Sequence, residues 1–204
     1  MGRFSQAIAE GDGISLIPML EGDVERLAAI AEAAGAEAVA VSNVAAVERV
    51  RAATHLPVLV RGNDVEGASA AGADGCVLAF ATPGWGGERN EGVEERYALA
   101  LELGLDCAVD VADEEALEEA LERLDPEIVL IAERDPGSVE EELERTLDLL
   151  PDVPAGKLVV SECAVSAREQ VLALERAGVD ALLVGVATGD LEATVAELSG
   201  RTGE

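Results

Sequence analysis

Short apolar runs alternate with longer amphipathic segments along the whole chain. The run Leu158–Val160 is too short for a helix, and its β-branched residues and polar ends predict a buried strand. Ser166 and Glu169 then fit the S-x-x-E capping box that opens a helix, and Gly178 is placed to end it. The run Ala181–Val184 predicts a second buried strand. A strand–helix–strand unit of this length predicts parallel pairing with a right-handed crossover.

The end of that helix belongs to a pattern that occurs four times: an apolar residue, a glycine, a second apolar residue and an acid. The four copies are Ala34-Gly35-Ala36-Glu37, Ala71-Gly72-Ala73-Asp74, Leu103-Gly104-Leu105-Asp106 and Ala177-Gly178-Val179-Asp180. Each glycine predicts the end of a helix, and each apolar run that follows predicts a strand buried on both faces. Repetition of this unit indicates a closed parallel barrel or a doubly wound sheet.

Taken in order, the chain gives eight strand–helix pairs after a short lead at residues 1–12. The predicted strands are Ile14–Met19, Ala38–Val41, Pro57–Val60, Gly75–Phe80, Cys107–Val111, Glu127–Ala132, Leu158–Val160 and Ala181–Val184. Each is followed by a predicted helix. In the fourth pair, a long loop rich in Pro and Gly, Ala81–Glu91, separates the strand from its helix. Eight pairs is the number in an α/β fold of the (β/α)8 or TIM barrel type, and 204 residues make it a short one. We therefore expect a single compact domain over residues 1–204.

The charge balance is strongly acidic. The chain has 42 acidic and 14 basic side chains, a formal net charge of -28. Such a charge argues against nucleic acid and anionic membranes as partners, because both would repel it. Acidic runs such as Asp113–Glu119 lie on predicted helices rather than in tails, which favours a solvated acidic surface over a site for a cationic partner.

The cysteines and the apolar runs bear on location. Cys76, Cys107 and Cys163 are few, odd in number and without metal-ligand spacing, which indicates a reduced, cytoplasmic setting. No apolar run is long enough to span a bilayer. We expect no metal, no cofactor, and a monomer or a weak homo-oligomer.

The excess of acidic groups predicts a stability that depends on salt. Self-repulsion destabilises the compact state at low ionic strength, and added salt screens it. We expect the melting temperature to rise markedly as NaCl is added, measured by calorimetry or circular dichroism. A melting temperature that stays flat from low to molar salt would show that these charges are already compensated.

Chemistry in such barrels is located where the strands end and lead into the helices. The candidates at these positions are Met19, Glu21, Ser42, Asn43, Arg61, Asn63, Asp110, Glu133, Arg134, Glu162, Cys163 and Gly185. Asp110 and Glu162 follow Ala108 and Val160 by two residues, so alternation along a strand aims them at the barrel axis. Buried carboxylates are costly unless they are paired, and Arg61 and Arg134 are placed to pair with them.

Other candidates have a structural alternative beside the functional one. Cys163 is a possible nucleophile, but a small packing residue is the simpler reading because His55, the one histidine, precedes the third strand at the opposite end. Trp85 stands among glycines in the long loop, where it can serve as a lid or only pack on the surface. Gly185 ends the eighth strand, where a phosphate commonly binds backbone N–H groups.

The strand ends resemble those of the indole-3-glycerol phosphate synthase family, from the first strand onward. The family patterns N-N-R-D-L, S-E-S-G and V-G-E follow strands 6, 7 and 8, and the patterns L-P-V-L-R-K and L-V-E-V mark strands 3 and 5. The corresponding segments here are Ala132-Glu133-Arg134-Asp135-Pro136, Ser161-Glu162-Cys163-Ala164, Val184-Gly185-Val186, Leu56-Pro57-Val58-Leu59-Val60-Arg61 and Ala108-Val109-Asp110-Val111. The resemblance implies a (β/α)8 barrel that closes an indole ring with loss of CO2 and water from a phosphorylated substrate, in tryptophan biosynthesis.

The same resemblance assigns roles to residues of this chain. It implies catalytic roles for Arg61, Asp110 and Glu162. It implies binding of substrate or its phosphate by the residues Arg134, Cys163, Ala164 and Gly185.

The departures from the family pattern fall on the chemistry. The family uses lysines as acid and electrostatic anchor, whereas the one lysine here, Lys157, stands at the start of strand 7. Met19 or its neighbours occupy the lysine position of strand 1, Arg61 that of strand 3, and Asp110 replaces a glutamate. Arginine binds an anion but cannot act as an acid near neutral pH. Two classes follow: a synthase-like enzyme of weak or lost activity, and a non-catalytic minimal barrel scaffold or phosphate-ligand binding protein.

Overall fold

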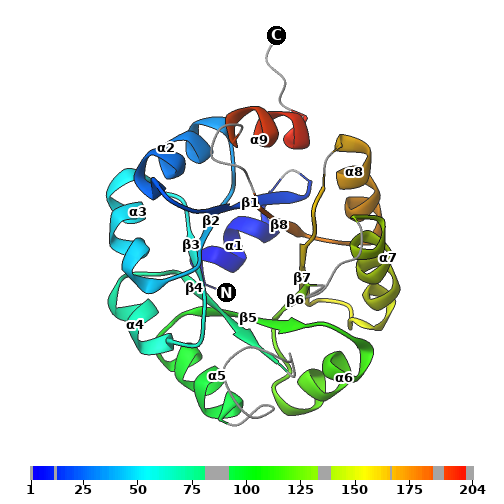
Figure 1. Ribbon diagram of the computed structural model, residues 1–204. Coiled ribbons are helices and arrows are strands. Elements are labelled where there is room, and N and C mark those ends of the chain that lie inside the picture. The colour runs from blue at the N-terminus through cyan, green and yellow to red at the C-terminus, as the bar shows by residue number, and fades with distance from the viewer. Residues whose placement is uncertain are drawn as a thin grey trace.

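A computed structural model describes residues 2–11, 13–80, 92–132, 139–165, 167–185 and 191–200. Eight parallel strands close into a barrel in sequence order, β1-β2-β3-β4-β5-β6-β7-β8, with helices outside it. Figure 1 views the chain along the barrel axis, with a ring of helices around the ring of strands. The (β/α)8 barrel is therefore confirmed, and the doubly wound sheet is excluded.

The strands agree closely with the expected ones. They are β1 Ser15–Leu20, β2 Val39–Val41, β3 Val58–Arg61, β4 Gly75–Ala79, β5 Asp106–Val111, β6 Ile128–Ala132, β7 Leu158–Glu162 and β8 Ala181–Gly185. The predicted ends were short at β3, β7 and β8, because strand pairing continues into Arg61, Glu162 and Gly185. The two charged residues and the glycine lie outside the apolar runs from which the strands are predicted.

The outer helices follow their strands. They are α2 Val24–Ala34, α3 Val47–Ala53 after the 3-10 turn η1 Val44–Ala46, α4 Val65–Ala70, α5 Val93–Glu102, α6 Glu114–Arg123, α7 Val139–Leu149 with the 3-10 turn η2 Leu150–Asp152, α8 Arg168–Ala177 and α9 Leu191–Ser199. The expected capping box of α8 is wrong in detail. The helix begins at Arg168, and the side chain of Gln170, not that of Glu169, accepts a hydrogen bond from the N–H of Ala167 at 3.2 Å. Ser166 lies outside the described residues.

The four repeated glycines end their helices as predicted. Gly35, Gly72, Gly104 and Gly178 have φ of 88°, 85°, 74° and 108°, the left-handed region that glycine adopts without strain. Three of the acids that follow accept a backbone N–H at the start of another strand: Glu37 from Leu16, Asp74 from Val58, and Asp180 from Val159. Burial raises the pKa of Asp180, and the hydrogen bond from Val159 opposes that rise. The acid of each of these three repeats thus accepts a hydrogen bond from a strand N–H group at the N-terminal end of the barrel.

The fourth acid, Asp106, has a different partner. It accepts hydrogen bonds from the backbone N–H groups of Gly2 and Ser5, at 2.9 and 2.8 Å, and from the Ser5 hydroxyl at 2.9 Å. Ser5 belongs to α1, Arg3–Ala9, and Gly2 is the N-cap of this helix, in the segment predicted to be only a short lead. Its own N-cap residue provides no side-chain cap, so Asp106 satisfies N–H groups that its first turn leaves open.

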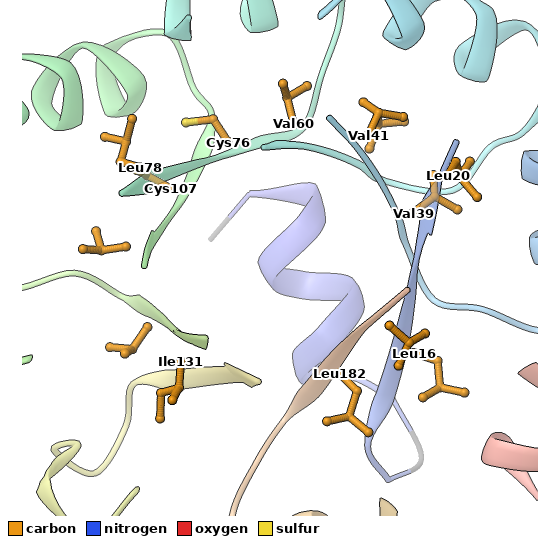
Figure 2. Packing of buried hydrophobic residues seen from close by; sticks show 14 of the residues in the cluster. Leu16, Leu20, Val39, Val41, Val60, Cys76, Leu78, Cys107, Ile131 and Leu182 are labelled. Atoms are coloured by element: carbon orange, nitrogen blue, oxygen red, sulfur yellow. The ribbon is translucent and has the colours of Figure 1, made fainter. Parts of the chain in front are cut away.

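Helix α1 fills the N-terminal end of the barrel. In Figures 1 and 2 it lies inside the ring of strands. Phe4 and Ile8 are buried and belong to the cluster formed by the inward side chains of the strands. A second cluster, which includes Leu16, Val60 and Cys76, points outward from the strands to the helices (Figure 2). The barrel therefore has one core inside, closed by α1, and one between strands and helices.

Candidate functional site

Three strands continue their inward alternation into charged residues. Arg61 ends β3, Asp110 lies near the end of β5, and Glu162 ends β7. Each follows, by two positions, a residue of the inner cluster, and these are Leu59, Ala108 and Val160. The prediction that Asp110 and Glu162 face the axis is confirmed by their shared contact with Arg61.

Arg61 lies between the two carboxylates. Its Nη2 is 3.6 Å from Asp110 Oδ2, and its Nη1 forms an ion pair with Glu162 Oε1. The Asp110 side chain is fully buried, Arg61 is 9% exposed and Glu162 is 30% exposed. The guanidinium thus links a buried carboxylate to one at the rim, which meets the condition that inward charges be paired.

A fourth residue completes this level of the barrel. Alternate strands contribute the four side chains of one layer in such barrels, and β1 is the odd-numbered strand that remains. Its Met19 is partly buried and packs against the inner cluster. We call Met19, Arg61, Asp110 and Glu162 the mouth layer. One apolar, one cationic and two anionic side chains give the layer a formal charge of -1.

The residues expected to bind phosphate do not share one environment. Gly185 ends β8 beside Met19 of β1, is exposed, and has open space where a Cβ would stand. Ala164 is exposed just after β7. Cys163 is buried in the outer cluster, so its side chain packs between strands and helices, which is the simpler of its two readings. Arg134, Glu133 and Trp85 lie outside the described residues.

A cavity of about 270 Å³ opens beside the ends of β1 and β2. Glu21, Ser42 and Asn43, all candidates from the sequence, line it together with Arg49. Arg49 was missed because it lies on α3, where it pairs with Glu25 of α2 across the helix interface. No motif in the sequence around Arg49 indicates that its side chain lies beside these strand ends.

Two further polar residues flank β3, one beyond each end. Asn63 follows β3, and its Oδ1 is buried without a hydrogen-bond partner among the residues that the structure describes. His55 precedes β3, at the end of the barrel that α1 closes, and its carbonyl accepts from Arg3. Among the described residues there is no cluster of metal-binding side chains and no helix long and apolar enough to cross a membrane.

The fold and the mouth layer define a (β/α)8 barrel with a polar site at the C-terminal ends of its strands, the usual location of chemistry in this class. A family model described as indole-3-glycerol phosphate synthase matches residues 18–198. The chain therefore belongs to the indole-3-glycerol phosphate synthase family, as its strand ends suggested.

Individual relatives match over shorter stretches. An indole-3-glycerol phosphate synthase of Acidithiobacillus ferrooxidans is 50% identical over 46 residues, 22% of this chain and 18% of the relative. One from a Geobacillus species is 31% identical over 107 residues, 51% of this chain and 42% of the relative. In both matches the chain spans less than half of the relative's length.

A solved structure supports the fold. The tryptophan synthase A-subunit of the hyperthermophile Pyrococcus furiosus superposes with a TM-score of 0.72 at 19% identity. The superposition covers 91% of this chain and 98% of that one. At this identity the likeness establishes the shared barrel architecture.

Proposed function

We propose that this chain binds a phosphorylated small molecule at the C-terminal end of its barrel and turns over the synthase substrate very slowly or not at all. The observation that carries this proposal is the composition of the mouth layer. Arg61 occupies the place of a family lysine and holds Asp110 and Glu162 in ion pairs. Met19 provides no charge on β1.

Ring closure needs a proton delivered to a carbonyl oxygen, a step that general acid catalysis typically speeds by about 10²–10⁴-fold. Arginine keeps its proton at neutral pH. Arg61 holds the carboxylates of Asp110 and Glu162 in ion pairs, and neither lysine nor histidine is among the four residues of the mouth layer. The mouth layer therefore retains electrostatic anchoring better than proton transfer.

Binding of a phosphate is supported at the ends of β7 and β8. Gly185 allows close approach of an anion to the backbone, with open space beside it. Backbone N–H groups bind a phosphate without adding charge, so this subsite does not require the family lysines that the mouth layer lacks. We therefore expect binding to survive the substitutions that remove turnover.

The test of catalysis is formation of indole-3-glycerol phosphate from the synthase substrate by the purified protein, followed by fluorescence. We expect no product, or a rate far below ordinary enzyme rates. Turnover on the order of 1 s⁻¹ or more would contradict the proposal.

A gain-of-function variant serves as the matched comparison. Met19→Lys, Arg61→Lys and Asp110→Glu together restore the family pattern at three positions of the mouth layer. A rise in turnover in this variant, with a wild-type chain that remains inactive, would assign the loss to these substitutions.

A further inference from the structure

We propose that Cys76 and Cys107 form a modification site, a buried pair of thiols that hydrogen peroxide converts to a disulfide between β4 and β5. The pair lies between the strands and the outer helices rather than in the mouth layer, so the proposal does not depend on the proposed function. The two cysteines are far apart in the sequence and have no motif spacing, so only the fold shows that they meet.

The register of two strands places the cysteines side by side. β4 and β5 are parallel neighbours, and Cys76 is the register partner of Cys107. Paired strands lie about 4.7–4.9 Å apart, within the Cα separation of about 4.4–6.8 Å that disulfides usually span. Both side chains point outward, because the next residues on the two strands, Val77 and Ala108, belong to the inner cluster. The two thiols therefore lie in the same layer, on the helix side of the barrel wall (Figure 2).

The environment of the thiols favours a disulfide as the product. A hydrogen bond to Cys76, together with burial, raises the pKa of Cys107 well above its usual value. Cys76 is fully buried, Cys107 is 4% exposed, and both belong to the apolar outer cluster. A disulfide is uncharged, whereas a sulfinic or sulfonic acid would put an anion into this layer. Coupling of the two sulfurs is therefore favoured over further oxidation of either one.

A cavity of about 510 Å³ brings small molecules close to the pair. Leu105 and Asp106, which directly precede Cys107, line this cavity together with Tyr97 of α5. Burial is the main cause that raises the pKa of Tyr97 to about 12, and the neighbouring Cys107 adds to that rise. Tyr97 thus borders both the cavity and the thiol. Hydrogen peroxide is small and uncharged, so the carboxylate of Asp106 does not repel it.

The reaction is a two-electron oxidation in two displacements. One cysteine, as its thiolate, attacks an oxygen of the peroxide, so that an S–O bond forms, the O–O bond breaks, and the hydroxide that leaves is protonated to water. The partner sulfur then attacks this sulfenic sulfur, so that the S–S bond forms, the S–O bond breaks, and a second hydroxide leaves and is protonated to water. Two thiols are oxidised to one disulfide, and one peroxide is reduced to two waters.

The experiment treats the reduced, folded chain with hydrogen peroxide, removes the peroxide, alkylates the remaining thiols in denaturant, and maps the peptides by mass spectrometry. We expect one of the three cysteines to remain alkylated and the other two to appear in linked peptides that contain Cys76 and Cys107. Dithiothreitol should restore all three thiols. The chain should remain a monomer on a non-reducing gel, because the bond is internal.

Cys163→Ala is the matched control for Cys76→Ala. Cys163 is also buried in the outer cluster, but it follows β7, which pairs with β6 and β8. Cys163→Ala should form the linked peptides to the wild-type extent and keep no free thiol, whereas Cys76→Ala should form none. Circular dichroism of the reduced variants checks that both are folded, and the peptide map of the wild-type chain does not depend on either variant.

Several results would overturn the proposal. One is three free thiols after a peroxide treatment that oxidises free cysteine. Another is sulfinic or sulfonic acid at Cys76 or Cys107 without the linked peptides. A link that included Cys163, or that formed only in denaturant, would show that the folded pairing of β4 and β5 does not direct the oxidation.

Discussion

Replacing Phe4 by alanine is expected to lower the free energy of unfolding by about 3–5 kcal/mol. Phe4 is fully buried on α1 and packs with the inward side chains of the strands. Its removal leaves a cavity at the closed end of the barrel, which a helix tied to Asp106 can only partly fill. Urea denaturation of the two proteins measures the difference.

Gln6→Ala on the same helix is the control. Gln6 is exposed, and its hydrogen bond to Glu10 lies at the surface, so this change should stay within about 0.5 kcal/mol of the wild type. If Phe4→Ala cost no more than Gln6→Ala, α1 would not belong to the cooperative core of the barrel.

The sequence predicted the barrel because local and periodic signals repeat along it. Buried strands read as apolar runs, and the glycine and acid at each repeat mark where a helix ends and a strand begins. The same signals could not reveal α1. Its cap is Asp106, more than a hundred positions away in sequence, and its seven residues are too few to show a helical period.

The site was predictable to the extent that it follows the strands. Alternation placed Asp110 and Glu162 at the axis, and Arg61 was found among the charged strand ends. The pairing of one arginine with both carboxylates depends on register across the barrel, which no local pattern encodes. Cys163 follows the same alternation as the two carboxylates, because its position one residue beyond the inward Glu162 turns it outward to the helices.

The second large effect is expected at Arg61. Arg61→Met keeps much of the side-chain length but removes the cation between Asp110 and Glu162. Taking one partner from a buried ion pair typically costs about 3–5 kcal/mol, because the remaining charge stays in a medium of low dielectric. We expect a loss of this size in the free energy of unfolding from urea denaturation at pH 7. Arg61→Lys, which keeps a cation, should lose less.

A triple variant separates lost charge balance from lost packing. Arg61→Met combined with Asp110→Leu and Glu162→Met removes all three charges of the mouth layer and keeps similar side-chain volumes. Replacing a whole buried ion cluster by apolar residues is often neutral or stabilising, so most of the stability lost in Arg61→Met should return. If the triple variant were as unstable as the single one, the cost would lie in the packing of Arg61. Recovery would show that the two inward carboxylates are what make this arginine necessary to the fold as well as to the site.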